Sequence, residues 1–123
     1  MVFCISISFL LSGCKKIMEG DIVGTWKSVD LVHPQASSEI IWEFTKENNF
    51  IVTVKNKNSN ISTTYFRSRY SVIWEGSKTV AKISGNDSYY SRSWIIKDMN
   101  EDILVLFNND KGNYSLEEFS KIK

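Results

Sequence analysis

Few side chains in this sequence have the chemistry for covalent or acid–base catalysis. The two cysteines, Cys4 and Cys14, lie near the N-terminus, and the one histidine, His33, precedes Pro34 in a predicted loop. Beyond Cys14 the sequence has no Cys/His pair, no Gly-x-Ser-x-Gly motif and no phosphate-binding loop. A zinc site needs several His or Cys ligands. We therefore expect no enzyme activity, no metal and no cofactor.

Acidic side chains occur in two groups, Asp98 with Glu101 and Asp102, and Glu117 with Glu118. A glycosidase places two carboxyl groups on either side of a scissile bond. These carboxylates instead lie in predicted turns or on the predicted outer faces of strands, where solvation accounts for them. They are not expected to form a catalytic pair.

The charges of the chain nearly balance, with Lys+Arg 15 against Asp+Glu 14 and a net charge of +1. A nucleic-acid-binding domain shows a clear basic excess, so we expect no nucleic-acid partner. Arg67, Arg69 and Arg92 are predicted to be surface residues. The length of 123 residues fits one domain.

The first 20 residues have the composition of an export and anchoring segment. Met1–Leu11 is an apolar run, shorter than the about 20 residues that a membrane-spanning helix needs. It has the length of a signal-peptide core. The residues that follow, Leu11-Ser12-Gly13-Cys14, resemble a bacterial lipoprotein box. This resemblance implies a signal peptide over 1–13 and a lipidated Cys14 that begins a tether over 14–20.

Such an anchor would place the protein in the bacterial cell envelope, at the outer membrane, with its domain periplasmic or on the outer face. An alternative interpretation remains open. No Lys or Arg precedes the apolar run, where a signal peptide carries positive charge. Ile5-Ser6-Ile7-Ser8 also alternates as a strand does. In the alternative, residues 1–11 form a buried strand and Cys14 is a core thiol.

From residue 22 onward, apolar residues recur at every second position between clusters of turn-forming residues. Ile40, Trp42 and Phe44, for example, share one face of a strand. The pattern predicts no helix of useful length and about eight strands, at 22–32, 39–45, 50–55, 61–75, 78–84, 92–99, 103–107 and 113–122. The domain over 21–123 is thus predicted to be all-β, either an up-and-down antiparallel β-barrel or a two-sheet sandwich. A meander favours closure, because an open one exposes its first and last edges.

Gly24-Thr25-Trp26, at the start of the first predicted strand, resembles the Gly-x-Trp of lipocalins and of their smaller bacterial lipocalin-like relatives. The segments 103–107 and 114–121 are similar to the late strands of that family, so the resemblance covers residues 20–123. It implies a small closed barrel in which Trp26 plugs one end and Gly24 permits a close backbone approach. In the family a basic residue of the last strand, more often arginine, packs over this tryptophan. Lys121 or Lys123 would take that place here by a cation–π contact.

Large aromatic residues are predicted to face the barrel interior. An eight-stranded barrel is either filled by its own side chains or holds one small ligand. In the first case these residues are core, and in the second they line an apolar pocket in which Tyr70 is a polar group. The candidate ligand-lining residues are Trp42, Phe44, Phe66, Tyr70, Trp74 and Trp94.

Two functions are compatible with these observations. One is a lipid-anchored, lipocalin-like domain that binds a small apolar or amphipathic ligand. The other is a solid barrel that serves as a scaffold and binds a protein partner, as an accessory or inhibitor lipoprotein of the envelope does. In both cases we expect a monomer that is held at the membrane through its lipid anchor.

Overall fold

The computed structural model describes residues 19–29, 37–110 and 113–122. A short 3₁₀ helix, η1 (Glu19–Ile22), precedes the strands and is the one helix in these ranges. The strands are β1 (Gly24–Ser28), β2 (Ser38–Phe44), β3 (Asn49–Asn56), β4 (Ser62–Glu75), β5 (Lys78–Ile83), β6 (Ser93–Met99), β7 (Ile103–Asp110) and β8 (Asn113–Lys121). The predictions for Cys4, Cys14 and His33 fall outside the described residues.

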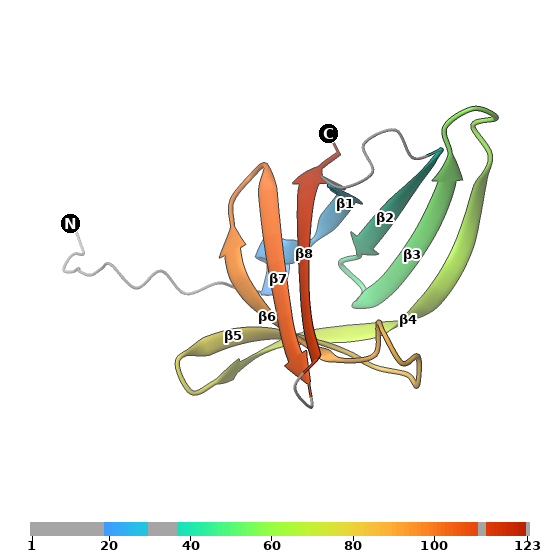
Figure 1. The fold of residues 1–123 in the computed structure, drawn as a ribbon. Helices are drawn as coiled ribbons and strands as arrows, with labels where there is room; N and C mark the ends of the chain where they lie inside the picture. Colours follow the sequence, from blue (N-terminus) through green and yellow to red (C-terminus); the bar gives the residue numbers. More distant parts are fainter. Residues whose placement is uncertain (1–18, 30–36, 111–112, 123) are drawn as a thin grey trace.

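The eight strands form one closed antiparallel barrel (Figure 1). Each strand is hydrogen-bonded to the next in sequence, and β8 pairs with β1 through Trp26 opposite Lys121 and Ser28 opposite Phe119. The prediction of an all-β, eight-stranded, up-and-down barrel is confirmed, and the two-sheet sandwich is wrong. The first strand was predicted too long, since Ile22 belongs to η1 and β1 ends at Ser28.

Because successive strands run in opposite directions, the connections alternate between the two ends of the barrel. We call the end that carries η1, the β4–β5 turn and the last residues of β8 the plug end. The other end carries the β3–β4 connection (57–61) and the β5–β6 connection (84–92), and we call it the mouth end. β4 links the two halves of the barrel, because it pairs with β3 over 62–69 and with β5 over 70–75.

The plug end is built around Trp26, which is fully buried. Its indole Nε1 donates a hydrogen bond to the carbonyl oxygen of Ile22, at 3.0 Å. The Nζ atom of Lys121 lies 5.2 Å from the centre of the Trp26 ring and donates to the carbonyl oxygen of Val23, at 3.5 Å. Gly24 has a φ of 151°, and a Cβ atom there would lie 2.7 Å from Cε of Lys121. Glycine is therefore the residue that lets this lysine cross the start of β1 and reach the tryptophan.

The core lies inside the barrel because alternate residues of each strand point inward. Trp42 and Phe44 of β2 and Phe50 and Val52 of β3 are buried in this way. The same alternation buries Leu104 of β7 with the other inward residues of β5 to β8. All of the buried apolar residues except Val80 form one contiguous cluster that extends from the plug end toward the mouth.

Candidate functional site at the mouth of the barrel

Trp42 occupies the centre of the barrel and is surrounded by aromatic rings. The centroids of Phe119, Phe50, Trp94 and Tyr90 lie 4.8, 5.2, 5.4 and 5.5 Å from that of Trp42. Three of these pairs are edge-to-face, an arrangement that fills space closely and that aromatic quadrupoles favour. At the level of Trp42 the interior is therefore occupied by side chains.

The six candidate ligand-lining residues fall into three places. Four of them belong to the buried cluster, namely Trp42, Phe44, Tyr70 and Trp94. Phe66 is partly buried and packs against that cluster from the mouth end. Trp74 is 47% exposed, although its position in β4 has the same parity as Tyr70. It lies opposite Thr79, two residues before the β4–β5 turn, where the hairpin extends past the core.

Tyr70 lies toward the plug end, away from the mouth. Its hydroxyl donates to the carbonyl oxygen of Thr45 at 2.8 Å, and its ring is 5.0 Å from that of Phe44. The polar atom of this side chain thus has a backbone partner next to the β2–β3 turn.

The β5–β6 connection closes the mouth end with the ring of Tyr90. This ring stacks on Phe66, with centroids 5.5 Å apart and planes 21° apart, and it meets Trp42 edge to face. Tyr65 and Tyr89 contact other edges of the same ring, at 6.1 and 5.2 Å. The side chain that covers the mouth end thus belongs to the β5–β6 connection and not to a strand.

Local hydrogen bonds fix the shape of this connection. The carboxylate Oδ1 of Asp87 accepts from the backbone N–H groups of Tyr89 and Tyr90, at 2.8 and 2.9 Å. Ser91 donates through its hydroxyl to the carbonyl oxygen of Ser84 and accepts from the N–H of Asp87. An Asp side chain that bonds N–H groups two and three residues ahead is a strong turn former. These bonds thereby hold the backbone of the two tyrosines in place.

A polar group lies beside these rings. Glu117 shares the inward parity of Phe119 on β8, and its carboxylate accepts a hydrogen bond from the hydroxyl of Tyr89. The Cζ atom of Arg92 is 5.1 Å from the centre of the Tyr89 ring. The sequence-based placement of Glu117 on the outer face of its strand is therefore wrong. For Glu117, the alternation that buries Phe119 was the available signal.

Arg92 is held at the mouth by three hydrogen bonds. Its Nη1 donates to Oδ1 of Asn108 at 3.2 Å and to Oγ of Ser115 at 3.3 Å, and its Nε donates to the carbonyl oxygen of Ser88 at 3.1 Å. Asn108 is buried and donates in turn to the carbonyl oxygen of Ser93. The guanidinium thus ties the β5–β6 connection to the last part of β7 and the first part of β8.

Burial perturbs the titration of this group of side chains. Loss of solvation raises the pKa of Glu117 above its usual range, and the hydrogen bond from Tyr89 opposes that shift. Burial, with smaller contributions from the charges of Tyr65, Asp87 and Glu117, raises the pKa of Tyr90 to about 12. The pKa of Tyr89 is raised further, first by burial and then by Glu117. Tyr89 is therefore a neutral hydrogen-bond donor at physiological pH.

We name this constellation the mouth cluster, and it contains Tyr65, Phe66, Tyr89, Tyr90, Arg92 and Glu117. Sequence reasoning missed Tyr89 and Tyr90, because the residues between the strands predicted at 78–84 and 92–99 were assigned no role. The sequence signal for the mouth cluster was the pair of adjacent tyrosines in a polar connection. Large aromatic side chains gain much from burial, so such a pair indicates a packed connection.

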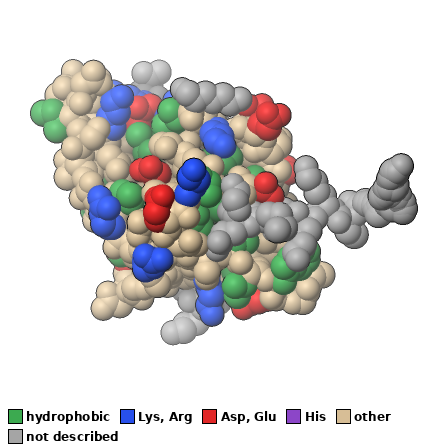
Figure 2. Space-filling model, turned by 180° about the vertical axis from the view of Figure 1, so that it is seen from behind, with side chains coloured by type: hydrophobic (Ala, Val, Ile, Leu, Met, Phe, Trp, Pro, Cys, Tyr) green, Lys and Arg blue, Asp and Glu red, His purple; other side chains and the backbone are tan. Residues whose placement is uncertain are grey.

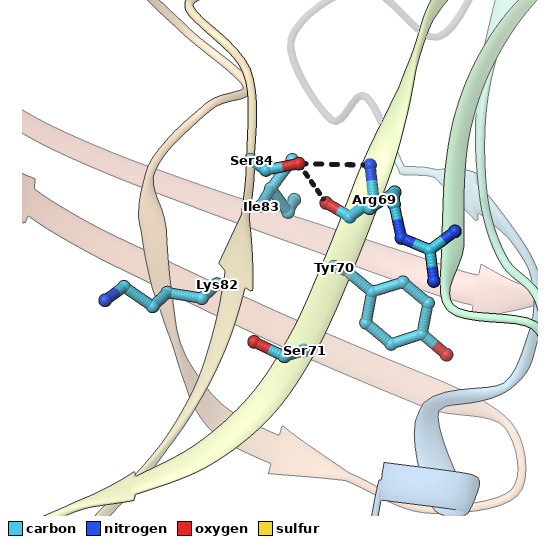
Figure 3. A pocket seen from close by; sticks show the side chains of 6 residues that line it. All are labelled: Arg69, Tyr70, Ser71, Lys82, Ile83 and Ser84. Atoms are coloured by element: carbon cyan, nitrogen blue, oxygen red, sulfur yellow. Dashed lines mark hydrogen bonds between the residues drawn. The ribbon is translucent and has the colours of Figure 1, made fainter.

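A separate hollow of about 250 Å³ lies where β4 and β5 meet. In Figure 3 the side chains of Arg69 and Lys82 point away from each other, and Ser84 is bonded to the backbone of Arg69, at 3.0 and 3.2 Å. The two cations thus do not converge on a common point. Within the described ranges, no group of His, Cys, Asp and Glu side chains could hold a metal ion.

Comparison with family models and with curated proteins gives no match for this chain. In the part of the chain that the structure describes, no helix is long and apolar enough to cross a membrane.

Proposed function

We propose that this protein is a lipid-anchored component of the bacterial cell envelope whose lipocalin-like barrel is a solid scaffold that binds a protein partner through the mouth cluster. The observation that supports this proposal most is the packing of side chains across the barrel at the level of Trp42. Trp42 is surrounded by four rings, and one of them, Tyr90, closes the mouth. A ligand inside the barrel would have to displace side chains from both positions.

The composition of the mouth cluster suits a protein interface. Tyrosine and arginine are enriched among the residues that dominate interface energetics. Tyr65 is 66% exposed, and Ile61, in the neighbouring connection, is 64% exposed. The hydrogen bonds of Asp87 and Arg92 hold the β5–β6 connection in place, which lowers the entropy lost on binding.

The lipid anchor rests on Leu11-Ser12-Gly13-Cys14 after the apolar run. Metabolic labelling with a palmitate analogue tests it in a bacterial host. We expect label on the parent chain and none on Cys14→Ala. Label that persists in the variant would exclude Cys14 as the attachment site.

Partner binding is tested by a photo-crosslinking amino acid placed at Tyr65 in the full chain in its own host. The matched control is the same amino acid at Trp74, which is also exposed but lies at the plug end. We expect a discrete crosslinked protein at position 65 and none at position 74. The same product at both positions, or none at position 65, would refute binding at the mouth.

A second candidate is the binding of a small apolar or amphipathic ligand, and one observation favours it. Tyr90 belongs to a connection, so it could leave the mouth without any change in strand pairing. Its departure would open a space between Phe66 and Trp42, with Glu117 and Arg92 as polar groups at the rim. A small molecule that co-purifies with the protein would favour this candidate.

A further inference from the structure

An apolar stripe runs along the outer face of the β7–β8 hairpin. It contains Ile103, Val105 and Phe107 of β7, Tyr114 and Leu116 of β8, and Ile122, which follows β8. Four of these side chains are well exposed, namely Ile103 (43%), Leu116 (57%), Tyr114 (74%) and Ile122 (42%). A closed barrel does not need this apolar surface for its own core, because its core residues point inward.

The stripe is nearly continuous from one end of the barrel to the other. Phe107 lies opposite Leu116, and its ring is 5.9 Å from that of Tyr114 at the mouth end. Glu118 is the one charged side chain among the outward positions 103–109 and 114–122 of the two strands. On the opposite side of the molecule, Lys, Arg, Asp and Glu side chains are interspersed with apolar ones over the surface (Figure 2). Four of the nine large hydrophobic side chains that are exposed among the described residues lie on this one hairpin and the residue that follows it.

The proposed anchor joins the barrel next to this stripe. η1 leads into β1, which pairs with β8, and the N–H of Ile122 donates to the carbonyl oxygen of Thr25 at 2.9 Å. The four residues 15–18 separate Cys14 from Glu19. At about 3.3–3.6 Å per residue, that segment spans less than about 20 Å even when fully extended. A lipid on Cys14 would therefore hold the plug end of the barrel close to the bilayer.

We propose that the β7–β8 stripe rests on the surface of the bilayer that holds the anchor, so that the barrel lies on its side. This inference rests on the proposed lipidation of Cys14. The apolar side chains insert at the headgroup level, and Tyr114, which has an apolar ring and a polar hydroxyl, suits the interface. Lys97, whose Nζ is 5.6 Å from the centre of the Phe107 ring, lies beside the stripe, where an ammonium can reach phosphate groups. The mouth cluster then faces along the membrane and not away from it.

The test uses the mature, lipidated chain, from Cys14 onward, in vesicles of phosphatidylethanolamine and phosphatidylglycerol that contain a spin-labelled phosphatidylcholine. A thiol-reactive fluorophore is attached to Tyr114→Cys or, as the matched control, to Ile61→Cys. Both positions are exposed and at the mouth end, but Ile61 belongs to the β3–β4 connection. An acylated Cys14 carries no free thiol, so each protein takes one label.

We expect the spin-labelled lipid to quench the fluorophore several-fold more strongly at position 114 than at position 61. Adding Leu116→Glu should reduce quenching at position 114, whereas Thr63→Glu on β4 should not.

Equal quenching at the two positions in an acylated protein would overturn the membrane contact and leave the anchor standing. A stripe covered by another protein or by a second copy would leave position 114 unquenched by lipid and would overturn it too. A mass without acyl chains on Cys14 would overturn the anchor and the stripe together.

Discussion

At the scale of single residues, the filled interior depends most on Trp42. Four aromatic rings contact it, and 1% of its surface is exposed. Trp42→Ala should lower the free energy of unfolding by about 3–5 kcal/mol, because it leaves a cavity in a packed core. The control is Trp74→Ala, which should cost less than about 1 kcal/mol because that side chain is half exposed. Urea denaturation measures both values, and a nearly neutral Trp42→Ala would indicate a pocket wall.

The loss of stability on replacing Gly24 has two sources, the contact of a new Cβ atom with Lys121 and the strain of a positive φ. Gly24→Ala should cost about 1–3 kcal/mol, because φ is positive and the new Cβ would meet the lysine side chain. In a Lys121→Ala background the contact is gone, so the cost should be smaller. A double-mutant cycle by thermal unfolding gives the difference. An unchanged cost would assign the whole effect to the backbone.

Glu117 should make the stability depend on pH. Its pKa in the folded protein is raised by burial above the ordinary value of 4.5, so the folded state binds the proton more tightly than the unfolded state. The resulting stability is present below the unfolded pKa and is lost as pH rises through the folded pKa. Glu117→Gln should therefore flatten the decline of unfolding free energy above pH 4.5. Glu118→Gln, exposed on the outer face, is the control, and identical pH profiles for both variants would refute the assignment.

At the scale of elements, the strands were largely predictable and the connections were not. The two-residue period of Ile40, Trp42 and Phe44 located β2 to within one residue at each end. The inward placement of Trp94 is likewise observed. The β5–β6 connection has no such period, because its shape depends on the side chain of Asp87 and on rings from distant strands. The alternation that located the strands therefore could not place its tyrosines.

The stability of that connection provides a test at this scale. Asp87→Ala removes the acceptor of two backbone N–H groups and should cost about 1 kcal/mol, as loss of a helix N-cap does. Hydrogen exchange at the amides of Tyr89 and Tyr90 should accelerate while the strand amides remain protected. The control is Glu101→Ala in the exposed β6–β7 turn. Unchanged exchange at both amides would show that ring packing alone fixes the connection.

At the scale of the whole molecule, closure of the barrel followed from strand count and spacing, since eight short strands in a meander bury their edges only by closing. The sequence left open whether the barrel is hollow, because the same inward aromatics can line a pocket or fill it. The difference depends on Tyr90, which enters from outside the strands and seals the mouth against Phe66. Alternation along a strand does not by itself predict burial. Trp74 has the parity of the inward residues, but it lies past the end of the core and is exposed.

The most direct test of the filled barrel is native mass spectrometry of the protein extracted from the envelope of its own host. We expect a monomer mass equal to that of the chain from Cys14 plus its acyl groups, with the same mass after denaturation. An additional small-molecule mass that is present in the native spectrum and lost on denaturation would contradict the account and establish a ligand-binding barrel.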